Sequence, residues 1–283
     1  METIFIALSN MSGIACASDR DHTLYQLSKK VPLALAVSPT SPIPWDSIIE
    51  QYKRAGGPEE KKKKFSDYVS HFLEFLSTIP VDESWKFQFK SDHEAIFMGY
   101  GKEDMFPCIY DLDLKVNPDS KRLEKDFHDY MKLSHDHNAA FFLLGDFEEV
   151  LTLLCGTTMH TEGILLENYS KQYEIYKERV IAKFKDTEYS SYVQKKFEEN
   201  DIFDIVLDNM NAATNKILSE VYVGLDSFSI EDLVTAAETL VNAEVRLKHL
   251  ASMGKEHPHS TKEIAVITRT EGVTWLKHSL FAL

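Results

Sequence analysis

Two consecutive pairs of short apolar segments fill the first 37 residues, and this spacing is the strongest constraint on the fold. The segments "TIFIAL" and "IACAS" flank the turn residues "NMSG", and "TLYQLS" and "VPLALAVS" flank a Lys-Lys pair. Each segment is rich in β-branched, aromatic or aliphatic residues, and each is too short for a typical helix. The sequence therefore predicts two β-hairpins in an antiparallel sheet. The continuous apolar run "PLALAV" further predicts a strand that is covered on both faces.

The remaining elements are predicted in groups rather than in strict alternation. Amphipathic helices are expected in "IPWDSIIEQYKRAGG" and "FSDYVSHFLEFL", followed by strands at "WKFQFKS", "EAIFMGYG", "FPCIYDLDL" and "AAFFLLGD". Mostly helical sequence follows, then a helix that starts after Ser229, and a closing hairpin in "EIAVITRTEGVTWLKHSL". Grouped strands and helices indicate an α+β fold. We predict one domain over residues 1–283, with a mostly helical insertion at about residues 160–225.

Charge and apolar patterning exclude several functional classes. The formal net charge of −14 disfavours binding to nucleic acid or to an anionic membrane, because a diffuse negative field repels phosphate. The start "METIFIALSN" has no basic region before an apolar segment, and no apolar run is long enough to span a membrane. We therefore expect a cytoplasmic protein. The three cysteines have no CxxC spacing and are expected to be reduced and buried.

Common cofactor and metal motifs are absent from the sequence. The chain has no GxSxG, P-loop or HExxH pattern. Histidine pairs occur in "HDH" at 135–137 and "HPH" at 257–259, but neither has a third ligand at a convincing spacing. We predict no cofactor and no metal site.

The order of segments resembles that of proteasome-type β subunits, which have the N-terminal nucleophile (Ntn) hydrolase fold. The stretch "TIFIALSNMSGIACASDRDHT" is similar to the family's start, with a threonine, an apolar strand, a turn glycine, a second strand and an aspartate. The later segments "PIPWDSIIEQYKR", "IFMGYGKEDMFPCIYDL", "AAFFLLGDFEEVL" and "GLDSFSIEDLVTAAETLV" look like those of uncharacterised bacterial proteasome-like proteins. The resemblance spans nearly the whole chain, and it implies a four-layer αββα sandwich.

The resemblance also implies positions for a catalytic site. Thr3 takes the place of the nucleophile, Asp19 that of the family's acid, and Thr23 that of the lysine. Asp146 and the pair Asp226 and Ser227 complete the positions equivalent to the family site. In such enzymes the threonine hydroxyl attacks a carbonyl, its free α-amine acts as the base, and the lysine ammonium lowers the relevant pKa values.

The sequence departs from this chemistry at two positions. Met1 and Glu2 precede Thr3, so that its amine is not free, and Thr23 carries no ammonium group. The leading hypothesis is a proteasome-like protein that has lost catalysis and works by assembly into a ring or stack, or through a protein partner of the helical insertion. One alternative is a threonine peptidase or amidohydrolase that matures by removal of Met1 and Glu2. Another is a small-molecule binding module that uses the vestigial cleft near Thr3, Asp19, Thr23 and Asp146.

Overall fold

The computed structural model describes most of the chain in segments. The described residues are 4–21, 23–38, 41, 43–58, 64–81, 95–117, 122–134, 137–145, 147–155, 159–199, 202–251 and 260–278. Two compact units are present: one combines Met1–Val150 with Tyr222–Leu283, and the other is Leu151–Val221.

The described strands form two antiparallel sheets, both in the first unit. Sheet A has the order β10-β9-β2-β1-β8, and its strands are β1 (Ile4–Asn10), β2 (Gly13–Ser18), β8 (Ala139–Gly145), β9 (Glu263–Thr268) and β10 (Gly272–Lys277). Sheet B has the order β3-β4-β5-β6-β7, and its strands are β3 (Leu24–Gln26), β4 (Leu33–Val37), β5 (Ala95–Gly99), β6 (Cys108–Asn117) and β7 (Arg122–Lys132). Antiparallel pairing of β1 with β2, β3 with β4, and β9 with β10 confirms the three predicted hairpins.

The two sheets share an apolar core. Phe5, Ala7 and Cys16 of sheet A cluster with buried residues of sheet B that include Ala34 and Met98. All five residues of β4 are buried, as "PLALAV" predicted, because alternate side chains of β4 enter this core and the core beneath the helices.

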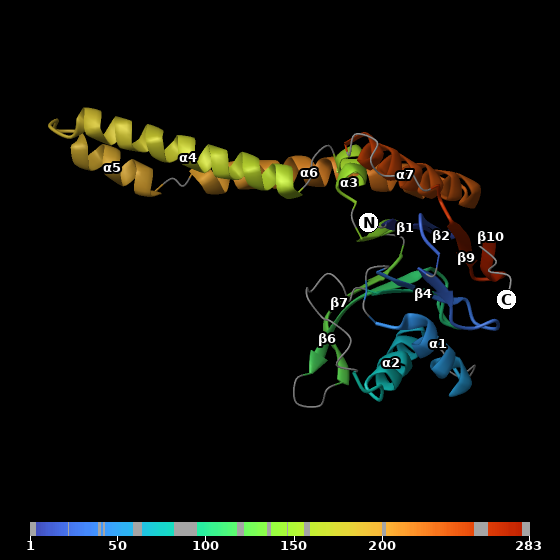
Figure 1. Cartoon of the computed structure of the whole chain (residues 1–283). Coiled ribbons are helices and arrows are strands. Elements are labelled where there is room, and N and C mark those ends of the chain that lie inside the picture. Colours follow the sequence, from blue (N-terminus) through green and yellow to red (C-terminus); the bar gives the residue numbers. More distant parts are fainter. Residues whose placement is uncertain are drawn as a thin grey trace. The chain divides into compact units, whose positions relative to one another are not determined.

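The outer face of sheet B is covered by α1 (Trp45–Arg54) and α2 (Phe65–Leu76). Both helices repeat apolar residues at helical spacing, and their buried faces pack on Leu33, Leu35 and Phe97. Figure 1 shows these two helices beside one another, in the blue and cyan part of the chain. Both helices were predicted from the sequence.

The other face of sheet A is covered by α7 (Ile230–Ala251). This helix contacts β1, β2 and β9. Its buried residues Leu233, Ala237 and Val241 recur every fourth position and form one apolar face. Ser229 and Asp232 cap its start: the Asp232 amide donates to Ser229 Oγ (3.1 Å), and the Ser229 amide donates to Asp232 Oδ2 (3.1 Å).

Four more helices lie between β8 and α7 in the sequence. They are α3 (Glu148–Cys155), α4 (Met159–Phe184), α5 (Ser190–Glu199) and α6 (Ile202–Asp226). In the second unit α4 and α5 lie side by side, with Phe197 of α5 near the rings of Tyr173 and Tyr176 of α4 (Figure 1). The chain is thus a mixed α+β protein with antiparallel sheets and seven helices among its described residues.

One strand was not expected. The segment "RLEKDFHDYMK" forms β7, which pairs along its length with β6 at the edge of sheet B. Seven of these residues are charged or histidine, so the segment lacks the apolar signal by which a strand is recognised. The predicted strand "WKFQFKS" lies outside the described residues.

Candidate functional site

Asp19 directly follows β2 and lies beside the start of β1. Its side chain is buried, and Oδ1 accepts a hydrogen bond from the Ile4 amide at 2.9 Å. In return the Asp19 amide donates to the Ile4 carbonyl at 3.3 Å. These bonds extend the β1–β2 ladder beyond the Phe5–Ser18 pair, so Asp19 holds the first described residue of β1 in place. Thr3 lies outside the described residues.

A buried pair of hydroxyl groups lies next to Asp19. The Ser18 and Thr23 hydroxyl oxygens are 2.8 Å apart, and Thr23 Oγ1 donates to the Arg20 carbonyl at 2.8 Å. Ser18 Oγ is also 3.1 Å from the Ile4 carbonyl. The pair therefore fastens the turn between β2 and β3 to the start of β1. Thr23 cannot do what an ammonium does, since a neutral hydroxyl does not lower the pKa of a neighbouring base through charge.

Glu263, the first residue of β9, belongs to the same cluster but was not predicted as a site residue. Its side chain is buried, and Oε2 accepts from the amides of Thr23 (3.3 Å) and Leu24 (3.2 Å). His278 Nε2 lies 3.8 Å from Oε1, and the His278 ring meets Trp275 edge-on at 4.3 Å. Glu263 thus joins sheet A to the start of sheet B. The one sequence feature that could have indicated Glu263 is its position as a carboxylate at the start of the apolar strand "EIAVIT".

A cavity of about 420 Å³ opens beside this cluster. Its wall comes from residues of β3 and the turn after it, from α1 and from the end of the chain: Leu24, Tyr25, Gln26, Leu27, Ser28, Lys29, Lys53, Trp275 and His278. The Tyr25 hydroxyl donates to Asp46 Oδ1 at 3.0 Å. Burial, and then the nearby Asp46 carboxylate, raise the pKa of Tyr25. Tyr25 is therefore a neutral hydrogen-bond donor rather than a base.

Asp226 and Ser227 lie at the other end of β1. Asn10, the last residue of that strand, donates through Nδ2 to the Leu225 (2.9 Å) and Phe228 (2.8 Å) carbonyls, which flank this pair. Six residue steps along β1 separate Ile4 from Asn10, roughly 20 Å at the usual rise of a strand. Ser227 is exposed, and its hydroxyl donates to the Gly224 carbonyl at 2.7 Å. The structure therefore groups Asp19 with Thr23 but does not bring Asp226 and Ser227 to them.

The remaining candidate residues form no further site among the described residues. Asp146 and the histidines of "HPH" lie outside the described residues, as does His135. Cys16 is buried in the core between the sheets, and burial raises the pKa of its thiol, which therefore stays protonated. Among the described residues, no three His, Cys, Asp or Glu side chains are placed to share a metal ion.

No protein-family model matches the sequence, and a search of curated proteins also finds no match. Within the described part of the chain, no helix combines the length and the apolar character needed to cross a membrane.

Proposed function

We propose that the chain is a non-catalytic protein with a proteasome-like Ntn-hydrolase fold, which works by assembling with further copies of itself in the cytoplasm. The fold part of the proposal is supported by the packing in the first unit. Two antiparallel sheets share a core, α1 and α2 lie against sheet B, and α7 lies against sheet A. This packing supports an αββα sandwich, the fold that the resemblance implies.

The loss of catalysis is supported by the chemistry around Thr23. At the position equivalent to the family's lysine, the structure has a buried hydroxyl that is bonded to Ser18 and to the Arg20 carbonyl. Asp19 uses one carboxylate oxygen to hold the Ile4 amide. Both side chains have clear structural roles, which fits an inherited site that now serves only the fold.

The observation that carries the assembly proposal is the exposed apolar surface of the second unit. Large apolar side chains are exposed along Leu151–Val221: Leu153, Ile164, Tyr169, Ile175, Tyr176, Tyr189, Tyr192 and Ile217. Exposed apolar and aromatic side chains at this density are typical of protein–protein interfaces. We propose a second copy of the chain as the occupant, because closed homo-oligomers are the commonest assemblies of soluble proteins and because the resemblance implies rings or stacks.

Size-exclusion chromatography with light scattering tests this proposal. We expect the wild-type protein to have a mass that is a multiple of 32.4 kDa at micromolar concentration. The double variant Tyr169→Ser/Tyr189→Ser removes two exposed rings of the second unit and is expected to lower that mass towards one chain. The control Met105→Ser/Leu276→Ser removes two exposed apolar side chains of the first unit and is expected to leave it unchanged. A wild-type monomer, or equal effects of both double variants, would contradict the proposal.

A threonine hydrolase is the second candidate, and one observation favours it. Asp19, at the position of the family's acid, is buried and bonded to the amide of Ile4, directly after Thr3. A working enzyme of this kind needs Thr3 as its first residue. N-terminal sequencing of the purified protein distinguishes the candidates: a start at Thr-Ile-Phe supports the hydrolase, and any start upstream of Thr3 rejects it.

A further inference from the structure

A second cavity, of about 390 Å³, lies at the end of the two sheets that is remote from Asp19. The start of β4 is at this end, whereas Val37 at its other end bonds through its amide to the Thr23 carbonyl. Four separate segments line the cavity, namely the turn before β4, α2, the loop after β5 and the β9–β10 turn: Lys30, Val31, Pro32, Tyr68, Tyr100, Gly101, Lys102 and Arg269. It is therefore distinct from the cluster around Asp19, and the inference below does not rest on the proposed assembly.

The lining of this cavity is positively charged, although the chain as a whole carries a net charge of −14. Lys30, Lys102 and Arg269 line it, and none of the described residues in its wall is acidic. Asp104, a buried acid in the loop after β5, lies next to the cavity wall but has partners of its own. Its carboxylate accepts from the amides of Phe65 and Gly101 and pairs with Lys132. The cavity therefore favours an anion.

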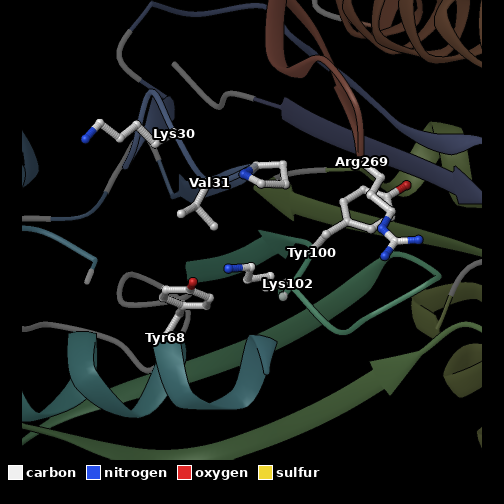
Figure 2. Close-up of a pocket in the computed structure, with 8 residues that line it drawn as sticks. Lys30, Val31, Tyr68, Tyr100, Lys102 and Arg269 are labelled. Carbon is white, nitrogen blue, oxygen red and sulfur yellow. The ribbon is translucent and has the colours of Figure 1, made fainter. Parts of the chain in front are cut away.

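Tyr100 supplies a polar group that the fold itself does not use. The side chain is only 2% exposed, and within the described part of the chain its hydroxyl has no hydrogen-bond partner. Figure 2 shows the hydroxyl on the Arg269 side of the ring and Lys102 on the other side, with its ammonium towards Tyr68. Burial raises the pKa of Tyr100, against a smaller opposite effect of Arg269, so the phenol is neutral and can donate. Because Tyr100 lines the cavity, a ligand or water there can accept this hydrogen bond.

The backbone around Tyr100 is fixed by its neighbours. The Tyr100 amide donates to the Pro32 carbonyl at 3.0 Å, and Asp104 Oδ2 accepts from the Gly101 amide at 3.1 Å. These bonds, together with the one from the Phe65 amide to Asp104, tie the loop after β5 to both β4 and α2. The backbone that carries Tyr100 is therefore in place before any ligand arrives, which reduces the entropy lost on binding.

We propose that this cavity binds a small organic phosphate monoester, with its phosphate between Arg269 and the Tyr100 hydroxyl. A guanidinium can form two parallel hydrogen bonds to a phosphate, and a neutral phenol adds a third donor. Lys102 contributes positive charge from the opposite side of the Tyr100 ring, whereas the Lys30 amine points away from the other labelled side chains (Figure 2). Val31, Pro32 and the Tyr68 ring offer apolar contacts to the organic part. The volume is within the usual range for small-molecule sites.

Isothermal titration calorimetry at low salt tests the proposal with defined probes. AMP and glucose 6-phosphate represent nucleotide and sugar phosphates, and adenosine, glucose and inorganic phosphate represent their parts. We expect at least one monoester to bind about tenfold or more tightly than its unphosphorylated partner and than inorganic phosphate. The monoester that binds identifies the source of the phosphate. If neither binds below about 10 mM, or if the unphosphorylated partner binds equally well, the proposal is wrong.

Two variants and one control test whether the monoester binds in this cavity. Arg269→Gln is expected to lower the affinity for the monoester about tenfold or more. Tyr100→Phe is expected to lower it by a smaller factor, because it removes only the hydroxyl group. Lys277→Gln removes an exposed lysine outside the cavity and serves as the matched control. Arg269 is exposed and Phe keeps the buried ring, so both variants are expected to fold, which thermal unfolding checks. Unchanged affinity of Arg269→Gln and Tyr100→Phe would overturn the assignment.

Discussion

Replacing Gly99 with alanine is expected to prevent stable folding of the first unit. A Cβ atom at this position would overlap the Pro32 carbonyl oxygen and would lie 2.9 Å from the Pro32 carbonyl carbon. Both atoms belong to the backbone next to β4, so neither can move away without breaking the β4–β5 pairing. The φ angle of +144° adds backbone strain for any residue with a Cβ. We expect a loss of more than about 4 kcal/mol in the free energy of unfolding, or an insoluble protein.

Gly272→Ala is the matched control for this prediction. Gly272 also has a positive φ, +76°, but no described atom lies within 4 Å of the position that a Cβ would take. Alanine there should lower the free energy of unfolding by only about 1 to 2 kcal/mol, because it introduces backbone strain but no clash. Urea unfolding followed by circular dichroism measures both variants. Equal losses at the two glycines would show that the close approach to Pro32 does not constrain β5.

Asp104→Ala is expected to destabilise the protein by about 3 kcal/mol. The buried carboxylate accepts from the Phe65 amide at 2.9 Å and from the Gly101 amide at 3.1 Å, and both donors lose their partner in the variant. Phe65 begins α2, so Asp104 also places a negative charge at the positive end of that helix. The exposed Asp67 bonds to the Lys64 amide at the same helix start and supplies the control, since Asp67→Ala should cost less than about 1 kcal/mol. Similar losses for both would contradict this account.

The contribution of Asp104 is also expected to depend on pH. Burial raises the pKa of this carboxyl, but the Lys132 hydrogen bond and the Phe65 and Gly101 amides together hold it below its ordinary value. A carboxyl with a lowered folded-state pKa stabilises the fold above its unfolded pKa, about 3.9, and this contribution is lost as the pH falls through the folded value. The stability difference between wild type and Asp104→Asn should therefore be largest near neutral pH and shrink below about pH 4. A constant difference over this range would show that the charge is not involved.

Local patterns in the sequence were sufficient for the elements with a clear period. The hairpin of β1 and β2 follows from two apolar segments around a short polar turn, and α1 and α2 follow from apolar residues at helical spacing. The edge strand β7 could not be found in this way. Its sequence is mostly charged, and its pairing with β6 is a tertiary interaction that no local pattern reports.

The candidate site was only partly predictable for a related reason. Asp19 and Thr23 are close in sequence and share the turn after β2, so their proximity follows from the short turn. Glu263 comes from a strand that is remote in sequence, and its bonds to the Thr23 and Leu24 amides depend on how the two sheets meet. The cavity around Tyr100 likewise combines four segments that are far apart in the chain. Residue types alone could not place these groups together.

Native mass spectrometry of the recombinant protein, followed by denaturation in the same instrument, tests the central claim most directly. It reports the mass of the assembly and the mass of the chain within it. The account predicts an assembly of two or more chains, each with the full 32.4 kDa mass and with Met1 and Glu2 still present. A single chain at micromolar concentration, or chains that begin at Thr3, would contradict the claim that this protein acts by assembly rather than by threonine catalysis.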